Sequence, residues 1–191
     1  MSDEQWRKVV KEQIQKREQK KWQEEMKTKT KLRTYVLVKQ ELKQEKYLEV
    51  RDRWGVPELT KLRGGANRLK IEKGRYSKIP PEQRICDFCN TGEVEDEKHF
   101  LVRCPLYCTL REGLWRDIYP LLRQPVLFST DEQKVKSLLK IEDKKLVKRV
   151  LRFVKQAMRI RGNKEKEREK QEEEERKAEK TKLSKKKQKL G

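Results

Sequence analysis

All four cysteines of this 191-residue chain and its only histidine lie in one short stretch, between Arg84 and Cys108. Four of these five side chains follow the spacing Cys86-x2-Cys89-x9-His99-x4-Cys104. Thiolate and imidazole are the donors that a structural zinc ion takes in a closed tetrahedron, and a Cys-x2-Cys turn directs two sulfurs to one point. The spacing therefore predicts a Zn²⁺ site formed by these four residues.

The residues between the donors suit such a site. Asn90-Thr91-Gly92 favours a turn that reverses the chain, and Asp96 is a suitable N-cap for a short helix that carries His99. On a continuous α-helix, positions five apart point about 140° away from each other. His99 and Cys104 would then diverge, but Pro105 disfavours the helical conformation at the preceding residue and should turn Cys104 off the helix end.

The same stretch leaves some alternatives open. Cys108 is a rival fourth ligand, although it is better interpreted as a small buried apolar residue on the next helix. A redox Cys-x-x-Cys motif with an unrelated histidine would need a strand–helix context that is not evident here. Among the nearby acids, one carboxylate could accept the free N–H of His99. Alternatively, acids are favoured at this point by a helix N-terminus, which we consider the better explanation for Glu97.

Composition limits the size of the core and the kind of partner. Only 33% of the residues are hydrophobic and 44% are charged, so a bound metal would contribute a real share of the folding free energy. The chain has 52 Lys and Arg against 32 Asp and Glu, a net charge of +20. This excess predicts a polyanionic partner, most simply nucleic acid, with an anionic membrane surface as the lesser alternative.

The sequence also bears on compartment. Its longest apolar runs, such as Tyr35-Val36-Leu37-Val38, are too short to span a membrane, and the polar start does not resemble a signal peptide. Clustered cysteines in an intracellular chain indicate metal ligands and not disulfides. We therefore expect an intracellular protein, nuclear or nucleolar, with Lys185-Lys186-Lys187 as a candidate targeting run.

Apolar residues at helical spacing predict several helices. A capping-box pattern at Ser2 and Gln5 precedes an amphipathic helix at 4–27, and a second helix is expected at about 31–52. Pro57 suits the first turn of a short helix that Gly64-Gly65 interrupts. One later helix should end at Pro120, another should begin at Thr130, and the cleanest periodicity lies within 143–160. We interpret the apolar stripes of the first two helices as helix–helix core; the first comprises Trp6, Val9, Val10, Ile14, Trp22 and Met26.

The predicted fold is mainly α-helical, with helical segments around a small irregular zinc-stapled module and a charged C-terminal tail that is helical or disordered. Four segments are expected: basic amphipathic helices at 1–55, the zinc-binding module at 56–124, a helical segment at 125–162, and a low-complexity tail rich in Lys and Glu at 163–191. Gly162 is expected to close the patterned part of the chain.

A longer motif surrounds the cysteines. It consists of Leu69-x-Ile71-Glu72-x-Gly74-Arg75-Tyr76, Arg84-x-Cys86-x2-Cys89, Val94-Glu95-Asp96-Glu97-x-His99-Phe100-Leu101 and Cys104-Pro105-Leu106-Tyr107-x3-Arg111. Over roughly residues 31–120 this order resembles the region downstream of the reverse transcriptase domain in animal non-LTR (LINE-type) retrotransposon polyproteins. The resemblance implies a zinc-binding CCHC quartet at Cys86, Cys89, His99 and Cys104. It also implies a nucleic-acid role beside a reverse transcriptase.

These features predict a function without catalysis, since no Asp-Asp pair for nucleotide transfer occurs in the chain. The leading hypothesis is a zinc-stabilised module that binds RNA or DNA mostly through phosphates, with a reverse transcriptase or another protein as a possible partner and no membrane association. One alternative is a protein-interaction scaffold built on the amphipathic helices; another is a decayed element fragment without selected activity. The arginines nearest the module are the weak candidates for phosphate contacts: Arg63, Arg68, Arg75, Arg84 and Arg103.

Overall fold

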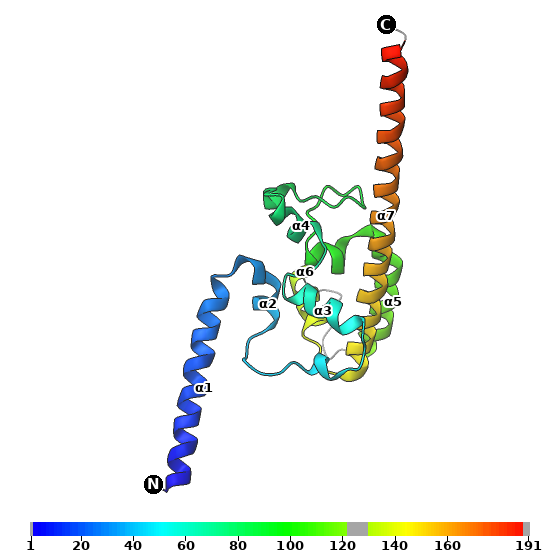
Figure 1. Cartoon of the computed structure of the whole chain (residues 1–191). Helices are drawn as coiled ribbons and strands as arrows, with labels where there is room; N and C mark the ends of the chain where they lie inside the picture. Colours follow the sequence, from blue (N-terminus) through cyan, green and yellow to red (C-terminus); the bar gives the residue numbers. More distant parts are fainter. Residues whose placement is uncertain (1, 122–129, 189–191) are drawn as a thin grey trace. The chain divides into compact units, whose positions relative to one another are not determined.

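The structure, a computed structural model, describes residues 2–121 and 130–188. Within these residues it consists of helices and loops without a β-strand, and the only extended pairing is an isolated antiparallel bridge between Ile85 and Val94 (Figure 1). The mainly α-helical class is therefore confirmed. The chain divides into two compact units, Met1–Lys155 and Gln156–Gly191, and helix α7 (Lys144–Gln188) runs from the first into the second.

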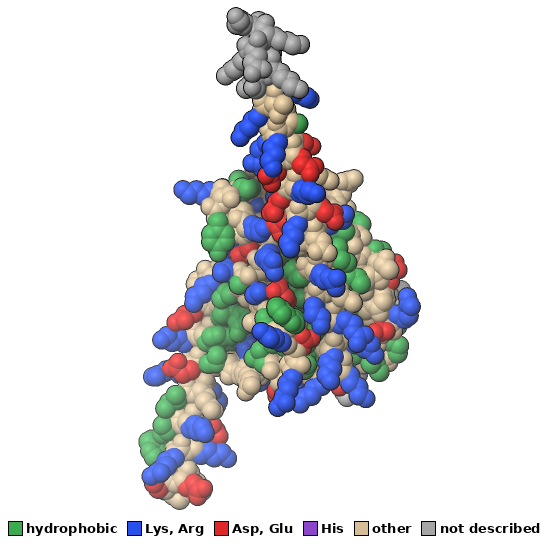
Figure 2. Space-filling view, turned by 45° about the vertical axis from the view of Figure 1, so that its right-hand side comes forward, with side chains coloured by type: hydrophobic (Ala, Val, Ile, Leu, Met, Phe, Trp, Pro, Cys, Tyr) green, Lys and Arg blue, Asp and Glu red, His purple; other side chains and the backbone are tan. Residues whose placement is uncertain are grey.

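The surface is strongly charged, with Lys and Arg side chains spread over the face shown in Figure 2. No described helix combines the length with the apolar character that crossing a membrane requires. The boundary predicted between residues 124 and 125 lies outside the described residues, as do the side chains of Lys185, Lys186 and Lys187.

Helix α1 (Asp3–Lys27) begins as its sequence predicts. The hydroxyl of Ser2 accepts a hydrogen bond from the Gln5 amide at 3.2 Å, and the Gln5 side chain accepts one from the Ser2 amide at 2.8 Å. This reciprocal pair is a capping box, which satisfies two of the amides that a helix start leaves without partners. Asp3 and Glu4 add favourable negative charge in the first turn.

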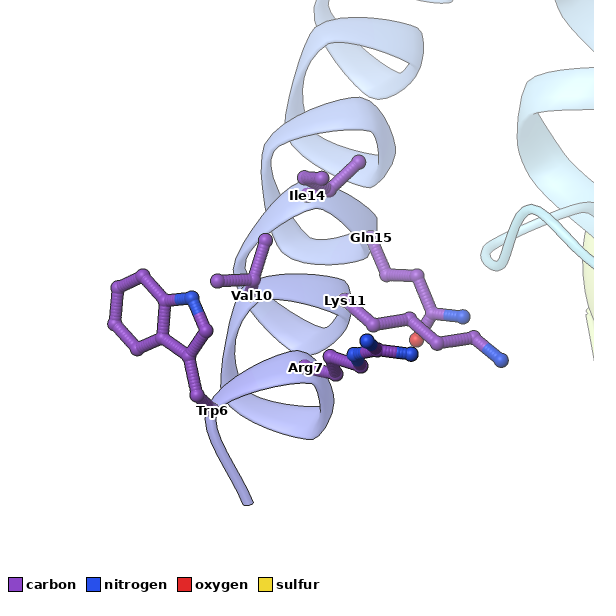
Figure 3. A pocket seen from close by; sticks show the side chains of 6 residues that line it. All are labelled: Trp6, Arg7, Val10, Lys11, Ile14 and Gln15. Atoms are coloured by element: carbon purple, nitrogen blue, oxygen red, sulfur yellow. The ribbon is translucent and has the colours of Figure 1, made fainter. Parts of the chain in front are cut away.

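The apolar stripe of α1 makes the predicted packing contacts only in its second half, where the ring of Trp22 lies edge-on to that of Tyr35 with centroids 6.4 Å apart. The first half does not form the helix–helix core that we predicted. Trp6, Val9 and Ile14 are 54%, 42% and 50% exposed, and Figure 3 shows Trp6 and Val10 projecting from the opposite side of the helix to Lys11. Only Met26, in the last turn, is buried. The prediction failed because no described element packs against the first half of α1, so the periodic pattern has no partner there.

The second predicted helix, at 31–52, is broken into three pieces. A turn of 3₁₀-helix η1 (Thr30–Leu32) leads into the short α2 (Arg33–Val38), and η2 (Lys46–Glu49) follows after a non-helical link. Tertiary contacts explain the break. The carbonyl oxygen of Gln40 accepts hydrogen bonds from the side-chain amides of Gln19 (2.7 Å) and Gln23 (3.0 Å) on α1. In a continuous helix this carbonyl would instead be bonded to an amide of its own helix and would accept these bonds less readily.

Four further helices and the start of α7 build the core of the first unit: α3 (Gly55–Arg63), α4 (Lys70–Tyr76), α5 (Cys108–Ile118) and α6 (Asp131–Leu139). Short helical turns η3 (Pro81–Gln83), η4 (His99–Arg103), η5 (Pro105–Tyr107) and η6 (Tyr119–Leu121) connect them. The ring of Phe100 lies 4.9 Å from that of Tyr107 and 6.4 Å from that of Phe153 on α7. The η4 turn is thereby packed between η5 and α7.

Two predicted helix starts in this core are confirmed. Thr130 caps α6 with a second capping box, together with Gln133, and α3 spans Pro57 and ends before Gly64-Gly65. Gly162, where the apolar pattern closes, lies within α7, which continues to Gln188. The described part of the charged tail is therefore helical, one of the two forms that we predicted for it. It contains Lys–Glu and Arg–Glu pairs one turn apart, such as Arg168–Glu172 and Lys177–Glu173. Pairs of this kind stabilise a helix by about 0.2–0.5 kcal/mol each, and they offset the cost of the glycine.

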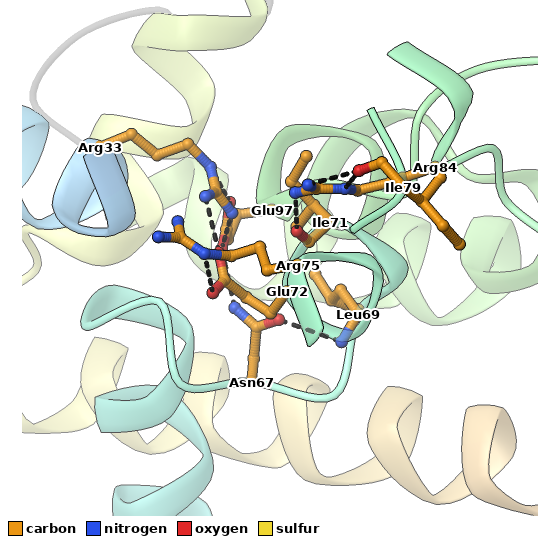
Figure 4. A network of polar contacts seen from close by, with 9 residues as sticks. All are labelled: Arg33, Asn67, Leu69, Ile71, Glu72, Arg75, Ile79, Arg84 and Glu97. Carbon is orange, nitrogen blue, oxygen red and sulfur yellow. Dashed lines mark hydrogen bonds and ion pairs between the residues drawn. The ribbon is translucent and has the colours of Figure 1, made fainter. Parts of the chain in front are cut away.

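A buried ionic network joins α2 to the cysteine-containing segment (Figure 4). Arg33 donates to both oxygens of Glu97, at 2.8–3.1 Å, and to Glu72 at 2.7 Å. Asn67 donates to the same Glu97 carboxylate at 2.7 Å. Both carboxylates are almost fully buried, so Arg33 supplies the positive charge that makes their burial tolerable.

We predict that Arg33→Met lowers the free energy of unfolding by about 3 kcal/mol, because it leaves the buried Glu97 without its cation and Glu72 with only the looser contact of Arg75 at 4.0 Å. Urea denaturation in the presence of Zn²⁺ measures this change. Arg17→Met is the matched control: Arg17 forms only an exposed ion pair with Glu18, and its loss should cost less than about 1 kcal/mol. Equal effects of the two substitutions would show that the network contributes little.

Candidate metal centre

The structure brings together the four residues that the spacing singled out. One donor atom from each of Cys86, Cys89, His99 and Cys104 lies within 4.8 Å of all the others, and three of the four side chains are buried. In a tetrahedral zinc site with Zn–S near 2.3 Å and Zn–N near 2.0 Å, the donors stand about 3.5–3.8 Å apart. The cluster therefore needs only a slight contraction to hold a metal ion. Among the described residues it is the only group of three or more such side chains.

The first two donors are held by a short β-like hairpin. Its arms meet at the bridge between Ile85 and Val94, where the amide of Cys86 donates to the Glu93 carbonyl and the amide of Glu95 donates to the Arg84 carbonyl, both at 2.9 Å. Gly92 takes a positive φ of 69° in the reversal, a conformation that costs glycine little. The hairpin fixes Cys86 at the start of the loop and leaves Cys89 near its tip.

The other two donors come from η4, a π-helical turn. A helical turn at residues 97–98 leads into η4. Asp96 caps this turn as predicted, since its carboxylate accepts a hydrogen bond from the amide of His99 at 2.7 Å. The amide of Cys104 then donates to the carbonyl of His99 at 2.7 Å. This i→i+5 bond widens the turn, so that positions five apart return to nearly the same side.

Pro105 has the predicted effect on Cys104. The backbone of Cys104 has φ −52° and ψ 121°, outside the helical region, as expected for a residue that precedes proline. The thiol therefore leaves the helix path at the point where the wide turn has already rotated it toward His99. The sequence pattern predicted the change of direction at Cys104 but not the π-helical turn that precedes it.

A carboxylate orients the histidine. Nδ1 of His99 lies 3.0 Å from Oε2 of Glu93, and Nε2 lies 3.3 Å from Sγ of Cys89. A carboxylate can only accept, so Nδ1 carries a proton, and Nε2 is the nitrogen that faces the thiols and could bind a metal. A carboxylate on the second nitrogen is the usual arrangement around a metal-ligating histidine.

The orienting carboxylate is itself held in place. Arg103 lies 3.4 Å from Glu93 and 2.5 Å from Asp131, the first residue of α6. Hydrogen bonding to His99 lowers the pKa of Glu93, with a smaller contribution from Arg103, so the carboxylate stays ionised. A chain of polar contacts thus leads from the histidine ring to α6.

The neighbouring acids have different tasks, which settles the alternatives left open by the sequence. Glu95 is buried and accepts a hydrogen bond at 2.6 Å from the amide of Lys70, at the start of α4. Glu97 belongs to the network of Arg33 and Asn67. Among these acids only Glu93 contacts the imidazole ring, so the ring partner of His99 precedes it by six residues and does not lie in its own helical turn.

A buried arginine secures the end of η4. Arg111 on α5 donates from Nε to the Leu101 carbonyl at 2.9 Å and from Nη2 to the Cys104 carbonyl at 2.8 Å. Carbonyls at the end of a helical turn lack partners within the helix; the Cys104 carbonyl also accepts a hydrogen bond from the Tyr107 amide at 3.2 Å. Burial lowers the pKa of Arg111. The guanidinium therefore fixes the backbone of the fourth donor.

The donors also bind protons, which sets the pH dependence of metal binding. Hydrogen bonding to Cys104 and burial raise the pKa of Cys86 to about 12, while the same hydrogen bond lowers the pKa of Cys104. Burial alone would lower the pKa of His99, but hydrogen bonds with Cys86 and Glu93 outweigh it and raise this pKa to about 9. A metal ion must displace these protons, so its affinity falls as the pH falls.

Cys108 does not belong to the cluster. It is exposed at the start of α5, and its thiol donates to Glu112 at 3.2 Å. Our expectation that it would be a buried apolar residue is wrong, because the η5 turn between Cys104 and α5 directs position 108 outward. As a rival fourth ligand it is separated from the three other donors, whereas Cys104 is next to them.

Two of the predicted phosphate-binding arginines are structural. Arg63 is 2% exposed; it donates to the Leu139 carbonyl, pairs with Glu45 and lies over the ring of Tyr47. Arg84 is buried and donates to the carbonyls of Ile71 (2.6 Å) and Ile79 (2.8 Å). A phosphate could reach neither without dismantling the core, so we withdraw both from the predicted set.

Arg84 also explains a glycine. A Cβ on Gly74 would lie 2.7 Å from the aliphatic part of the Arg84 side chain, which covers this position of α4. Glycine is therefore required for the close approach and not for an unusual φ. The other candidates are accessible: Arg68, Arg75 and Arg103 are all exposed. Arg103 is also engaged by Glu93 and Asp131.

Comparison with protein-family models, with curated proteins and with solved structures finds no match for this chain. The resemblance to the C-terminal region of retrotransposon polyproteins thus remains a prediction that rests on the residues quoted for it.

We predict that the protein binds one Zn²⁺ per chain and that Cys89→Ser or Cys104→Ser reduces the bound zinc to less than about a tenth, because a structural site needs all four donors. Metal analysis of the dialysed proteins measures the stoichiometry. Cys108→Ser is the matched control and should retain the full complement. Loss of zinc from the Cys108 variant alone would overturn the assignment of Cys104.

Removal of the metal should unfold the site locally, since the binding free energy of a structural zinc ion is also folding free energy. Hydrogen exchange with and without a chelator should show lost protection at the hairpin, at η4 and at the first turn of α5. The amides of α1 serve as an internal control, because the residues that this helix contacts are distant in sequence from the metal cluster. Unchanged protection at η4 after verified metal removal would contradict this expectation.

Proposed function

We propose that this chain is a non-catalytic, zinc-stabilised module that binds nucleic acid. The metal assignment is supported by the donor set, because three thiols and one imidazole suit zinc better than the oxygen-preferring Mg²⁺ or Ca²⁺. Four protein donors complete the tetrahedron and leave no open position for a substrate or a reactive water. A closed site of this kind supports the fold and does not perform chemistry.

The observation that carries the nucleic-acid part of the proposal is the charge. The chain has 52 Lys and Arg against 32 Asp and Glu, and only a few of these cations, among them Arg63, Arg84 and Arg111, are buried in the fold. Most of the remaining positive charge stands on the surface (Figure 2). Such a surface attracts a polyanion, and a phosphodiester backbone is the most common one inside cells.

The proposed binding tolerates different sequences. Phosphate contacts supply affinity and orientation, whereas sequence is read at the edges of the bases. The spacing of the zinc ligands differs from that of a two-Cys, two-His finger, whose helix reads bases in the major groove. Descent from the C-terminal region of a retrotransposon polyprotein, with a nuclear or nucleolar location, is consistent with this role and is part of the proposal.

The scaffold alternative is favoured by one observation, the exposed side chains of Trp6, Val9 and Ile14 on α1. An unpaired apolar stripe on a helix is a possible contact for a partner helix. The two functions differ in their dependence on salt, because apolar association is not weakened by added salt whereas phosphate contacts are.

We predict that the zinc-loaded protein binds unrelated DNA and RNA oligomers with similar affinities. The logarithm of the association constant should fall by about 0.7–0.9 for each phosphate contact per tenfold rise in salt. Fluorescence anisotropy across a salt series gives the slope and the specificity together. Absence of binding near physiological salt would refute the nucleic-acid role, and self-association that salt does not weaken would favour the scaffold.

A further inference from the structure

One stretch of α7 carries charge of a single sign. Every charged residue between Asp143 and Glu165 is a lysine or an arginine, whereas the following turns carry both signs in close alternation. A helix surface usually interleaves its charges, because neighbouring like charges repel each other by a few tenths of a kcal/mol per pair. Such a run creates positive electrostatic potential along one side of the helix, and its repulsive cost has to be explained.

Within the first unit, four of these cations share one face of the helix. Lys145, Lys148, Arg152 and Lys155 fall within about 80° of one another around the axis and span about 15 Å along it. The opposite face is buried, with Val147, Val150, Leu151 and Val154 all at most 3% exposed. The core thus anchors the backbone from which these cations project. We call these four side chains the α7 cation face.

The cations of this face are available. All four are exposed, and Lys145, Lys148 and Arg152 have no carboxylate within ion-pair distance among the described residues. Lys155 has only a loose contact of 3.8 Å with Asp52. The cations that flank the face are different, since Lys144 pairs with Glu49 at 3.1 Å and Arg149 with Asp117 at 2.9 Å. The flanking cations are therefore neutralised by carboxylates, whereas the cations of the face itself are not.

We propose that the α7 cation face binds the phosphate backbone of a double-stranded nucleic acid. This inference rests on the proposed function and assigns it a surface. It also replaces the arginines that we withdrew, since the α7 cation face is exposed whereas Arg63 and Arg84 are committed to carbonyls in the core. None of its four residues contacts the metal cluster, so the cluster supports the fold while another surface carries the ligand.

The chemistry of the face favours a duplex over a single strand. Proteins that bind single strands stack the bases on exposed aromatic rings, but the only aromatic residue between Lys144 and Lys164 is Phe153, which is buried. The same comparison argues against a membrane. Helices that lie on a bilayer insert exposed apolar side chains beside their cations, and the residues beside this face are polar or buried.

A charge-swap experiment on the full, zinc-loaded chain tests the proposal. Lys145, Lys148, Arg152 and Lys155 are changed together to Gln, which has nearly the same helix propensity. The matched control changes Lys8, Lys11, Lys16 and Lys20 of α1 to Gln, which removes the same charge from exposed sites. Anisotropy with a labelled 20-base-pair DNA duplex and with a single strand of the same sequence is measured from low to physiological salt, and circular dichroism verifies the helix content.

The α7 variant should bind the duplex at least about tenfold more weakly, with a salt slope smaller by about 3, since each lost phosphate contact removes about 0.9. The control should stay within about threefold of the natural protein. If the natural protein binds the duplex and the two variants lose affinity equally, the α7 cation face is not the contact, although the proposed function stands. The proposal also fails if the α7 variant loses binding to the single strand but not to the duplex. If the natural protein binds no nucleic acid, both proposals fall.

Discussion

The arrangement of the metal cluster depends on a short acidic segment whose carboxylates all point to different partners. Glu93 holds the histidine ring, Asp96 caps the turn on which the histidine stands, Glu95 accepts from the start of α4, and Glu97 is clamped by Arg33. Four negative charges within five residues would repel one another in an unfolded chain. In the fold each is compensated separately, so the segment becomes a junction between α2, α4, η4 and α6.

This junction shows why a small module can be stable with little apolar core. Buried carboxylates are costly unless charged or hydrogen-bonding groups surround them, and here the surrounding groups come from elements far apart in the sequence, such as Arg33 and Asn67. Those contacts join the N-terminal helical segment to the cysteine-containing part, across the segment boundary at residue 55 expected from composition. Composition marks changes in residue type, whereas ionic contacts determine which segments hold together.

The features that the sequence predicted correctly are those that depend on near neighbours. Ser2 and Thr130 cap their helices, Asp96 caps the turn that leads into η4, and Pro105 turns Cys104 out of η4, because each effect operates over a few residues. The failures involve distant partners. The helix expected at 31–52 is broken where Gln40 bonds to α1, and Arg63 and Arg84 proved to be buried donors to carbonyls that no local pattern reveals. The π-helical turn was also not predicted, since it differs from an α-helical turn by one hydrogen bond.

The four donors of the cluster lie within a single segment of fewer than twenty residues, from Cys86 to Cys104. A loop of this length closes quickly and at a small entropic cost. During synthesis the complete donor set leaves the ribosome before α6 and α7 do, so metal capture does not have to wait for those helices to emerge. The order of the sequence therefore allows the metal-binding segment to fold first and to serve as the template on which the later helices, including the basic face of α7, are laid down.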